Sequence, residues 1–445
     1  MIIIAEKIVS GGDSLAKING KAVFVPQLLP GEKAEIEIVE SHKDYDRGKV
    51  IKILESSPYR REPPCPYYGI CGGCNLQIAD DESQKQIRMQ ILQDCFRRAM
   101  RLNENSPEAE VVYNAKIISG ENWEYRNRFQ FHSGGLKRRA QESIVALNDC
   151  LIATQEVREL LKGKKLPERY GRLHVFNGNI AEENDFLLRK GAAAQDSHRH
   201  AENDDIQETS VKICGKTIHF DVRGFFQSNI GAFEKAIEAI RPIVASYTSG
   251  VSGARNMSNA CSTTGLCDES DQLVADSANS SQHDSSENIE LLDMYSGVGT
   301  FSALLGDLFA KTTLVEHNRK ALRLADKNLA GIPYDVFAMT GEKWVHTQAA
   351  HKKYDAVIID PPRSGIEKPV MNWLCGNSDG TSCDNAHAKQ RKNFPNVIFS
   401  VSCDPVTHAR DAALLTAAGF KMKTLMMLDF YPQTSHIESF AVFEA

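Results

Sequence analysis

The chain of 445 residues has no run of about 18 uncharged apolar residues, the length that a membrane-spanning helix needs. Its N-terminal apolar stretch, MIIIAEKIVSGG, is too short for a signal peptide, and no cleavage-like sequence follows it. We therefore expect no membrane partner and a cytoplasmic location, and we expect a monomer. In that compartment the eleven cysteines would be reduced thiols, metal ligands or nucleophiles rather than a disulfide framework.

A strong positive charge, which would point directly to nucleic acid, is also lacking, since the formal net charge is -6. Most of the acidic excess lies in two segments, 196–210 and 250–290, which are rich in Ser, Asn and Asp and poor in apolar residues. Such composition is typical of polar insertions in loops. Without these segments the rest of the chain is mildly basic, which permits RNA as a partner without demonstrating it.

The pattern of apolar residues predicts three parts. Residues 1–59 alternate short β-like runs with Gly and Pro turns, which favours a small OB-like β-barrel. Residues 60–225 are mixed and mostly β, with a strand over 123–132, an amphipathic helix over about 82–101 that we expect to pack on the third part, and a polar insertion at about 194–210. From residue 226 strands alternate with helices, which predicts an α/β domain with a mostly parallel, Rossmann-like sheet and polar insertions at about 248–288 and 375–391.

The segment LLDMYSGVGTFSALLG, residues 291–306, reads as a strand, a glycine turn and the start of a helix. Gly297 and Gly299 would let the backbone approach a ligand, although the motif is GxGxxS and not the full dinucleotide fingerprint. Glu316 ends the next predicted strand, where an acid can hold the ribose hydroxyls of an adenosine. These two features indicate a nucleoside cofactor, either NAD or S-adenosylmethionine.

DAVIIDPPRSGI, residues 355–366, places Asp360 and two prolines at the end of another strand, at the same edge of the sheet. A DPP tripeptide alone is common in surface turns. In the order glycine turn, acid, DPP, however, the chain resembles the class I S-adenosylmethionine-dependent methyltransferases, which favours S-adenosylmethionine over NAD.

A cysteine cluster, CPYYGICGGC, spans residues 65–74 with the spacing C-x5-C-x2-C. Three thiolates need a fourth ligand, and Cys150 is the next cysteine that does not lie on the apolar face of a predicted helix. Four cysteines suit either tetrahedral zinc or a 4Fe-4S cluster, and the spacing does not distinguish them. Structural thiols without a metal are the third possibility.

Another thiol lies in NVIFSVSCDPVTHARDAALL, residues 396–415, where a predicted strand gives way to a helix. Cys403 would then lie at the ligand-binding edge of a parallel sheet. The alternative is a small buried apolar residue, because free cysteine is among the most buried residue types.

Taken together, these motifs resemble the RNA (uracil-C5)-methyltransferase family, the RlmD/RumA and TrmA group, over nearly the whole chain outside its insertions. The resemblance rests on SSPYRREPPCPYYGICGGCNLQ at the end of the N-terminal part, GFFQSN at 224–229, LLDMYSGVGTF, VIIDPPRSG, VSCDP and SHIES at 435–439. It implies an N-terminal TRAM domain that binds RNA and a central domain with a 4Fe-4S cluster. The cluster ligands that it implies are Cys65, Cys71, Cys74 and Cys150.

For the catalytic domain the resemblance implies that Cys403 is the nucleophile and Glu438 the base. The residues that it implies for contact with S-adenosylmethionine are Gln227, Tyr295, Glu316 and Asp360. Two features depart from the family: Thr300 stands where the rRNA enzymes often carry Asn, and the polar insertions have no counterpart.

The chemistry explains why such residues are needed. Uracil C5 is a poor nucleophile, so a thiolate adds to C6 first, and a nearby cation such as Arg363 would increase the thiolate fraction of Cys403. A proton must later leave C5, which calls for a general base; Glu438 is the candidate and His436 the alternative. The target base must be flipped out of a stack or lie in a loop.

We expect 23S ribosomal RNA as the substrate, because the TRAM domain and the four cysteines occur together, with a transfer-RNA uridine as the alternative. A non-catalytic RNA-binding or RNA-folding protein is a second class of hypothesis, against which the intact set of catalytic and cofactor residues argues. Cytosine-C5 enzymes place a catalytic cysteine differently, and the DPPR segment here has none.

Overall fold

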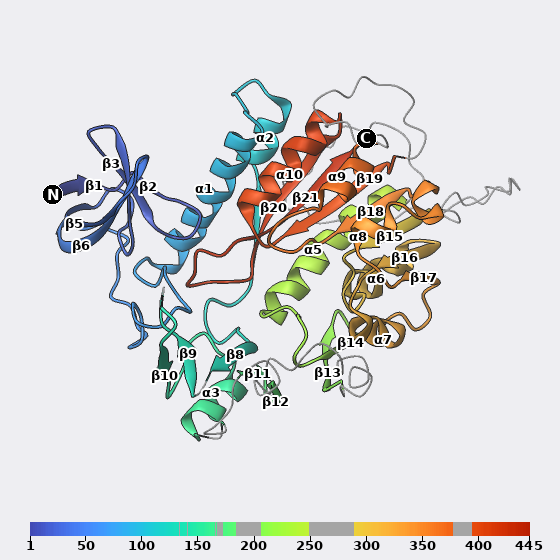
Figure 1. Cartoon of the computed structure of the whole chain (residues 1–445), viewed down its shortest axis with the longest axis horizontal. Coiled ribbons are helices and arrows are strands. Elements are labelled where there is room, and N and C mark those ends of the chain that lie inside the picture. Colours follow the sequence, from blue (N-terminus) through green and yellow to red (C-terminus); the bar gives the residue numbers. More distant parts are fainter. Residues whose placement is uncertain are drawn as a thin grey trace, which may run out of the picture.

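The computed structural model describes residues 1–132, 134–139, 141–164, 166, 172–183, 206–248, 289–376 and 394–445 (Figure 1). The predicted polar insertions at 194–210, 248–288 and 375–391 lie outside these residues, apart from their ends. One end needs correction: the strand β13 begins at Glu208, inside the predicted limits of the first insertion.

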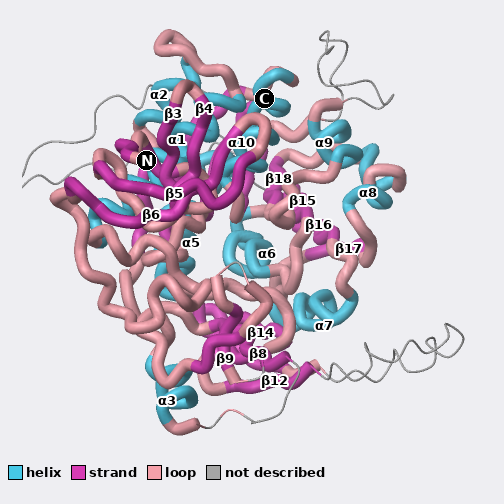
Figure 2. The backbone as a smooth tube through the Cα atoms, turned by 60° about the vertical axis from the view of Figure 1, so that its left-hand side comes forward, coloured by secondary structure: helices cyan, strands magenta, loops and turns pink. Residues whose placement is uncertain are grey.

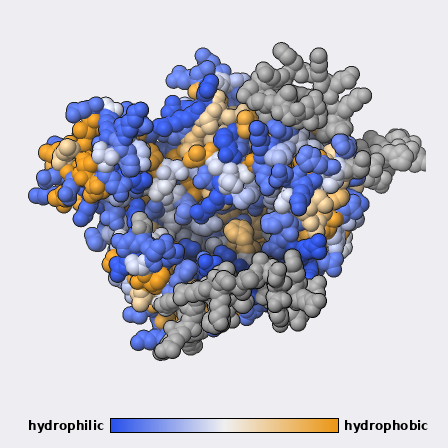
Figure 3. Space-filling view, in the orientation of Figure 1, coloured by the Kyte–Doolittle hydropathy of each residue, from blue (hydrophilic) through white to orange (hydrophobic). Residues whose placement is uncertain are grey.

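The N-terminal domain is a six-stranded sheet with its own core. Its strands follow the order β1-β5-β6-β4-β3-β2. They are β1 (Ile2–Ile4), β2 (Lys7–Ile8), β3 (Ser14–Ile18), β4 (Lys21–Val25), β5 (Lys33–Ser41) and β6 (Tyr45–Glu55). Alternate residues such as Val23, Val25, Ala34 and Ile36 point into this core, as the period of two along a strand requires. The outer face keeps exposed apolar side chains, visible as the orange area at the left of Figure 3.

A second sheet of five strands lies below the cysteine segment in Figure 1, in the order β10-β9-β8-β11-β12. Its strands are β8 (Arg128–His132), β9 (Gly135–Lys137), β10 (Ile144–Ala146), β11 (Arg172–Phe176) and β12 (Asn179–Glu183), and helix α3 (Gln155–Lys162) contributes to their core. The predicted strand over 123–132 is therefore only half correct, because residues before Arg128 are not in a ladder. Tyr125 instead donates its hydroxyl to the carbonyl of Pro432 at 2.7 Å.

The third sheet has eight strands in the order β17-β16-β15-β18-β19-β21-β20-β7. The strands are β7 (Lys116–Ser119), β15 (Glu290–Met294), β16 (Lys311–Val315), β17 (Tyr334–Phe337), β18 (Ala356–Ile359), β19 (Val397–Ser402), β20 (Lys421–Asp429) and β21 (Glu438–Glu444). In this sheet as described, only β21 runs antiparallel to its neighbours. The predicted fold class, α/β with a mostly parallel methyltransferase-like sheet, is confirmed.

Successive residues of the central strands are buried on opposite faces of this sheet. Ile359 and Ile398 belong to one core, whereas Ile358 and Phe399 belong to the other. Helices α1 (Asp81–Ala99), α2 (Pro107–Tyr113), α8 (Gly341–Trp344), α9 (Lys368–Leu374) and α10 (Pro405–Ala417) contribute to the first core, with the short 3-10 helix η3 (Gln348–His351). The second core is completed by α5 (Ile230–Thr248), α6 (Thr300–Leu305), α7 (Arg319–Asn328), the 3-10 helix η2 (Gly306–Leu308) and the hairpin β13 (Glu208–Ile213) and β14 (Lys216–Asp221). The strands run near-continuously apolar because both faces are covered.

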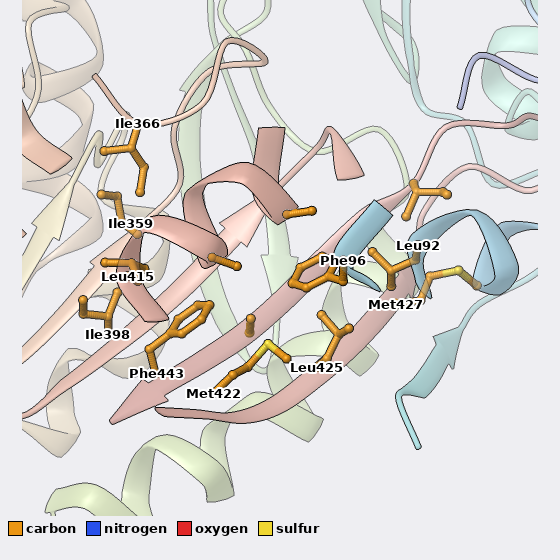
Figure 4. Packing of buried hydrophobic residues seen from close by; sticks show 14 of the residues in the cluster. Leu92, Phe96, Ile359, Ile366, Ile398, Leu415, Met422, Leu425, Met427 and Phe443 are labelled. Atoms are coloured by element: carbon orange, nitrogen blue, oxygen red, sulfur yellow. The ribbon is translucent and has the colours of Figure 1, made fainter. Parts of the chain in front are cut away.

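Helix α1 belongs to the catalytic domain by its packing. Leu92 and Phe96 lie against Leu425 and Met427 of β20 (Figure 4), and α1 also packs along α10. The strand β7 then extends the catalytic sheet by pairing in parallel with β20. Together with the β13–β14 hairpin, these elements show that the predicted central part, 60–225, is not one unit. The chain enters the catalytic domain, leaves it and returns, as the sequence colours of Figure 1 show. Figure 2 shows the neighbouring strands β18, β15, β16 and β17 of the catalytic sheet side by side. No helix within the described ranges has the length and apolar character to cross a bilayer.

Candidate active site

Four of the side chains that the sequence analysis assigned to the active site follow directly after the carboxyl ends of parallel strands. Tyr295 follows β15, Glu316 follows β16, Asp360 follows β18 and Cys403 follows β19. Because parallel strands end at the same edge of a sheet, these four residues lie along one crevice.

Glu438 reaches the same edge for a different reason. Since β21 runs antiparallel to β19, its first residue lies beside the last residue of β19, and the ladder pairs Ser402 with Ser439. The register therefore places Cys403 and Glu438 next to each other, although 34 positions separate 403 from 438 along the chain. Asp404 fixes the start of α10 behind the thiol by accepting the N–H groups of Val406 and Thr407 at 2.9 Å each.

A cavity of about 750 Å3 opens at this edge. Its wall includes all six residues that the sequence predicted for catalysis and cofactor contact: Gln227, Tyr295, Glu316, Asp360, Cys403 and Glu438. A volume of this size accommodates a nucleoside cofactor together with part of a substrate.

One end of the cavity has the features of a nucleoside site. Glu316 is almost buried and holds the glycine turn and the start of α7, because its carboxylate accepts the N–H of Gly297 at 3.1 Å and that of Asn318 at 2.6 Å. Gly297 has φ +56°, and a Cβ there would meet no atom within 4 Å, so its backbone faces open space. Gly299, with φ +72°, is the N-cap of α6 and leaves no room for a side chain against Leu329. Backbone and carboxylate are thus both presented to a ligand.

Two buried polar atoms in the cavity wall have no hydrogen-bond partner among the residues that the structure describes. Gln227 is 6% exposed and its Oε1 is unpaired, and the hydroxyl of Ser296 is also unpaired. Leaving such groups unsatisfied is costly, so they are groups that a polar ligand would satisfy. Phe225, two residues before Gln227, also lines the cavity, and its side chain is 70% exposed. The Arg128 guanidinium lies 5.9 Å from the centre of its ring.

The carboxyl groups at the inner end of the cavity have raised pKa values. Burial, followed by the charge of Asp293, raises the pKa of Asp360 to about 7. Burial and then Asp360 raise the pKa of Glu438 well above its usual value, against the opposing effect of Arg363. Asp293, whose pKa burial also raises to about 7, accepts the hydroxyl of Ser302 at 2.6 Å and thereby fixes α6.

The thiol of Cys403 does not match one expectation. Arg363 does lower its pKa, as predicted, but burial and the neighbouring charges of Glu438 and Asp360 outweigh that effect and raise the pKa to about 12. The site without ligands is too anionic and too buried for a thiolate, so the depressed pKa that the sequence analysis expected is absent.

Two further sequence predictions concern this cavity. Thr300 lines it as the first residue of α6. His436, the alternative base, is not among its lining residues; its ring lies edge-on to Tyr431 with centres 5.9 Å apart. Of the two candidate bases, only Glu438 reaches the cavity.

The four cysteines of the predicted cluster also come together. Cys65, Cys71, Cys74 and Cys150 line a second, small cavity of about 30 Å3 whose wall is otherwise largely apolar. The first three lie on a tight loop in which Gly69 takes φ +80°, and the N–H of Gly73 points at the Cys71 sulfur at 3.4 Å. Hydrogen bonds from backbone N–H groups to cysteine sulfur are a feature of iron-sulfur sites.

Burial raises the pKa of Cys74 to about 12 and that of Cys150 to about 11, so thiolates here need a compensating cation. In the part of the chain that the structure describes, no group of three or more His, Cys, Asp or Glu side chains is arranged to hold a single metal ion. The four thiols line one common cavity.

Comparisons with known proteins agree with this geometry. Residues 2–51 match the model of the TRAM domain. An RNA methyltransferase of Treponema denticola is 35% identical over 472 aligned positions that cover 99% of this chain and 98% of the relative. The chain belongs to the TRAM-containing RNA (uracil-C5)-methyltransferase family.

Two other members of the family span the whole chain. The 23S rRNA (uracil(1939)-C(5))-methyltransferase RlmD of Shewanella amazonensis is 28% identical, with 97% of this chain and 93% of the relative covered. The crystal structure of the Pyrococcus abyssi tRNA (uracil-54, C5)-methyltransferase with S-adenosyl-L-homocysteine superposes with a TM-score of 0.63 at 18% identity and covers all of both chains, which shows the shared fold.

Sequence reasoning missed several cavity residues of this methyltransferase. Met339 and Thr340 line the cavity after β17, whose four residues carry too short a pattern to be predicted as a strand. Phe225 had a signal in the doubled phenylalanine of GFFQSN. In the segment 430–437, which leads into Glu438, only residues 435–437 had a signal, as part of SHIES; residues 430–434 had none.

Proposed function

We propose that the protein transfers a methyl group from S-adenosylmethionine to C5 of a specific uridine in 23S ribosomal RNA, with Cys403 as nucleophile and Glu438 as base. The observation that carries the proposal is that the β19–β21 register puts these two residues side by side in the wall of one cavity. The RlmD relatives that match along the whole chain favour ribosomal RNA over transfer RNA.

Cys403 begins the reaction as its thiolate. Its sulfur forms a bond to C6 of uracil, and the electrons of the C5–C6 double bond move towards C5 and O4. Burial and the negative charges of Glu438 and Asp360 raise the pKa of Cys403. A cation that enters the cavity lowers this pKa, so the thiol loses its proton more readily. S-adenosylmethionine supplies the methyl group and, through its sulfonium, that positive charge.

Glu438 completes the reaction. Once C5 carries both its hydrogen and the new methyl group, the carboxylate takes the C5 proton, the C5–C6 double bond re-forms and the Cys403 thiolate leaves. Burial and the charge of Asp360, which raise the pKa of Glu438, make its carboxylate a stronger base than an exposed one.

A uridine must leave its stack to enter this cavity. Phe225 offers an exposed ring at the cavity wall on which a base can stack, and Arg128 behind it donates two hydrogen bonds to the carbonyl of Gly224 that hold the ring's loop in place. Gln227 and Glu316 bind the cofactor, together with Tyr295 and Asp360. These roles are part of the same proposal.

The proposal includes a 4Fe-4S cluster held by Cys65, Cys71, Cys74 and Cys150. These four thiols would hold the cluster, because they line one common cavity and four cysteine thiolates are the usual ligand set of a 4Fe-4S cluster. The cluster ties the 65–74 loop to Cys150 and so stabilises the central domain.

The test is direct. RNA from cells with and without this gene is digested and its methylated uridines are mapped by mass spectrometry; the expected result is the loss of one 5-methyluridine from 23S rRNA, restored by the wild-type gene and not by Cys403→Ala. Loss of a 5-methyluridine from transfer RNA instead would establish the alternative substrate, and no loss from either RNA would refute the proposal.

A further inference from the structure

The position of Glu438 depends on the segment of residues 430–437, because Glu438 is the first residue of β21 and the preceding strand, β20, ends at Asp429. A loop between two strands has no ladder to fix it. Most of the side-chain hydrogen bonds that hold this segment come from residues 61–125, which include helix α1 and lie far from the segment along the chain.

Gln433 is the centre of these contacts. It is fully buried, and its φ of +70° is a left-handed conformation that a residue with a Cβ adopts at a cost. Its carbonyl accepts the N–H groups of Asn75 and Leu76 at 3.2 and 3.1 Å, and its own N–H donates to Gln84 Oε1 at 2.8 Å.

The polar atoms of the Gln433 side chain are hydrogen-bonded, as its backbone is. Its Oε1 accepts from Arg61 at 3.0 Å and from Gln84 at 2.9 Å, and its Nε2 donates to Asp81 at 3.0 Å. A residue with this many buried partners is held in one place, and the strained backbone is maintained by them.

Ser435, two residues closer to Glu438 along the chain, makes the second contact. The Ser435 N–H donates to Asn75 Oδ1 at 2.8 Å, and Asn75 Nδ2 donates to the Ser435 hydroxyl at 2.9 Å and to the carbonyl of Gly11 at 3.2 Å. Asn75 directly follows Cys74. The N-terminal domain, the cysteine loop and the segment before Glu438 therefore meet at one asparagine.

From these contacts we infer that Gln433 and Asn75 are positioning residues, which hold segment 430–437 against the cysteine loop and thereby place the Glu438 carboxylate for proton removal. The inference rests on the proposed function, since it assigns a role to Glu438. The loop of residues 65–74, which Asn75 directly follows, then helps to fix the position of Glu438. Neither Gln433 nor Asn75 lines the active-site cavity.

Loss of a positioning residue gives a specific kinetic result. In Gln433→Ala and Asn75→Ala the thiol still adds to C6 and the methyl group is transferred, but a displaced carboxylate removes the C5 proton slowly. The covalent RNA–protein adduct should therefore accumulate, and kcat should fall by about a hundredfold, the effect of misplacing a catalytic group by about 1 Å. Because the slow step follows methyl transfer, the KM for RNA should fall together with kcat, whereas the affinity for S-adenosylhomocysteine should stay nearly unchanged.

The experiment compares these two variants with Glu438→Gln and with the control Gln93→Ala. Gln93 lies on α1, as does Gln84, a partner of Gln433; it donates to the backbone carbonyls of Val112 and Tyr113 at 3.2 Å but has no hydrogen bond to segment 430–437. Each purified protein is mixed with S-adenosylmethionine and the RNA that the wild type methylates, and adducts are separated on a denaturing gel. Thermal melting and S-adenosylhomocysteine binding establish that each variant is folded.

Adducts in Glu438→Gln, Gln433→Ala and Asn75→Ala, but not in Gln93→Ala, would support the inference. If Glu438→Gln accumulates the adduct and neither positioning variant does so, the inference is overturned while the proposed function stands. Asn75→Ala decides the result where Gln433→Ala does not fold. If Glu438→Gln itself gives no adduct, the assignment of the base fails and the inference falls with it.

Discussion

Replacing Arg88 by Met should destabilise the catalytic domain strongly and in a pH-dependent way. Arg88, on α1, and Asp429, at the end of β20, form an ion pair of 2.7 Å in which each side chain is 1% exposed, and Arg88 also donates to the carbonyl of Thr434 at 3.2 Å. Methionine keeps most of the packing volume but leaves the Asp429 carboxylate buried without its cation.

Two contributions set the size of the loss in the free energy of unfolding. Breaking one partner of a buried pair costs about 3–5 kcal/mol. The loss has a ceiling, however, because Asp429 can take up a proton instead: relative to an unfolded pKa of about 3.9, keeping it neutral at pH 7 costs about 4 kcal/mol. We therefore expect a loss of about 3–4 kcal/mol at pH 7, or roughly 10 °C in melting temperature for a domain of this size.

The stability loss of Arg88→Met should be larger at high pH than at low pH. The folded variant holds a proton on Asp429 that the unfolded chain releases above about pH 3.9, so its stability falls as pH rises, and the deficit relative to the wild type shrinks by about 1.4 kcal/mol for each unit that the pH is lowered. In the wild type, burial raises the pKa of Asp429 and Arg88 opposes that rise.

The assay is urea and thermal unfolding of wild type and variant at pH 7 and pH 5.5, followed by intrinsic fluorescence. Arg97→Met is the matched control on the same helix; Arg97 is half-exposed, its pair with Asp94 spans 3.3 Å, and its loss should cost less than about 1 kcal/mol. A second variant, Arg88→Met with Asp429→Leu, should recover most of the stability. A loss below about 1 kcal/mol for Arg88→Met, or one equal at both pH values, would refute the reasoning.

Three further predictions concern the two sites. Glu316→Ala should weaken S-adenosylhomocysteine binding in calorimetry by about tenfold to a hundredfold, because the charge-assisted hydrogen bonds that hold Gly297 and Asn318 are worth about 1.5–3 kcal/mol; unchanged affinity would contradict its role. The rate of adduct breakdown and product release should rise with pH as Glu438 loses its proton, and Asp360→Asn, by removing a negative neighbour, should shift that rise to lower pH; a shift to higher pH would contradict the electrostatics. Protein purified without oxygen should be brown and carry about four irons, with the colour lost when any of the four cluster cysteines is replaced by Ser; stoichiometric zinc without iron would exclude the cluster.

Much of this site is readable from the sequence because its residues follow strands. Apolar runs that stop at an acid or a thiol, as before Asp360 and Cys403, identify the carboxyl ends of parallel strands, and the predicted strands of the catalytic domain are confirmed. The roles of Cys403 and Glu438 come from the resemblance to the family and remain predictions. Cys150, by contrast, was reached from the sequence as the next cysteine outside a helical apolar face, and it lines one cavity with the other three cysteines.

Other features depend on contacts that no local pattern encodes. The four residues of β7 join the catalytic sheet because β20, more than 300 positions later, leaves an edge open to them. Gln433 finds its partners among residues 61–122, and the raised pKa of Cys403 depends on carboxylates brought near it by two other strands. Such effects appear only when the whole chain has folded.

The fate of the covalent adduct tests the central claim most directly. Wild type, Cys403→Ala and Glu438→Gln are each incubated with S-adenosylmethionine and substrate RNA, and with 5-fluorouridine RNA, and run on denaturing gels. Glu438→Gln should retain a band of retarded mobility, because the C5 proton cannot leave, and 5-fluorouridine RNA should trap the wild type in the same way; Cys403→Ala should form no adduct and no product while still binding RNA and cofactor. An adduct formed equally well by Cys403→Ala would show that another residue is the nucleophile and would contradict the account.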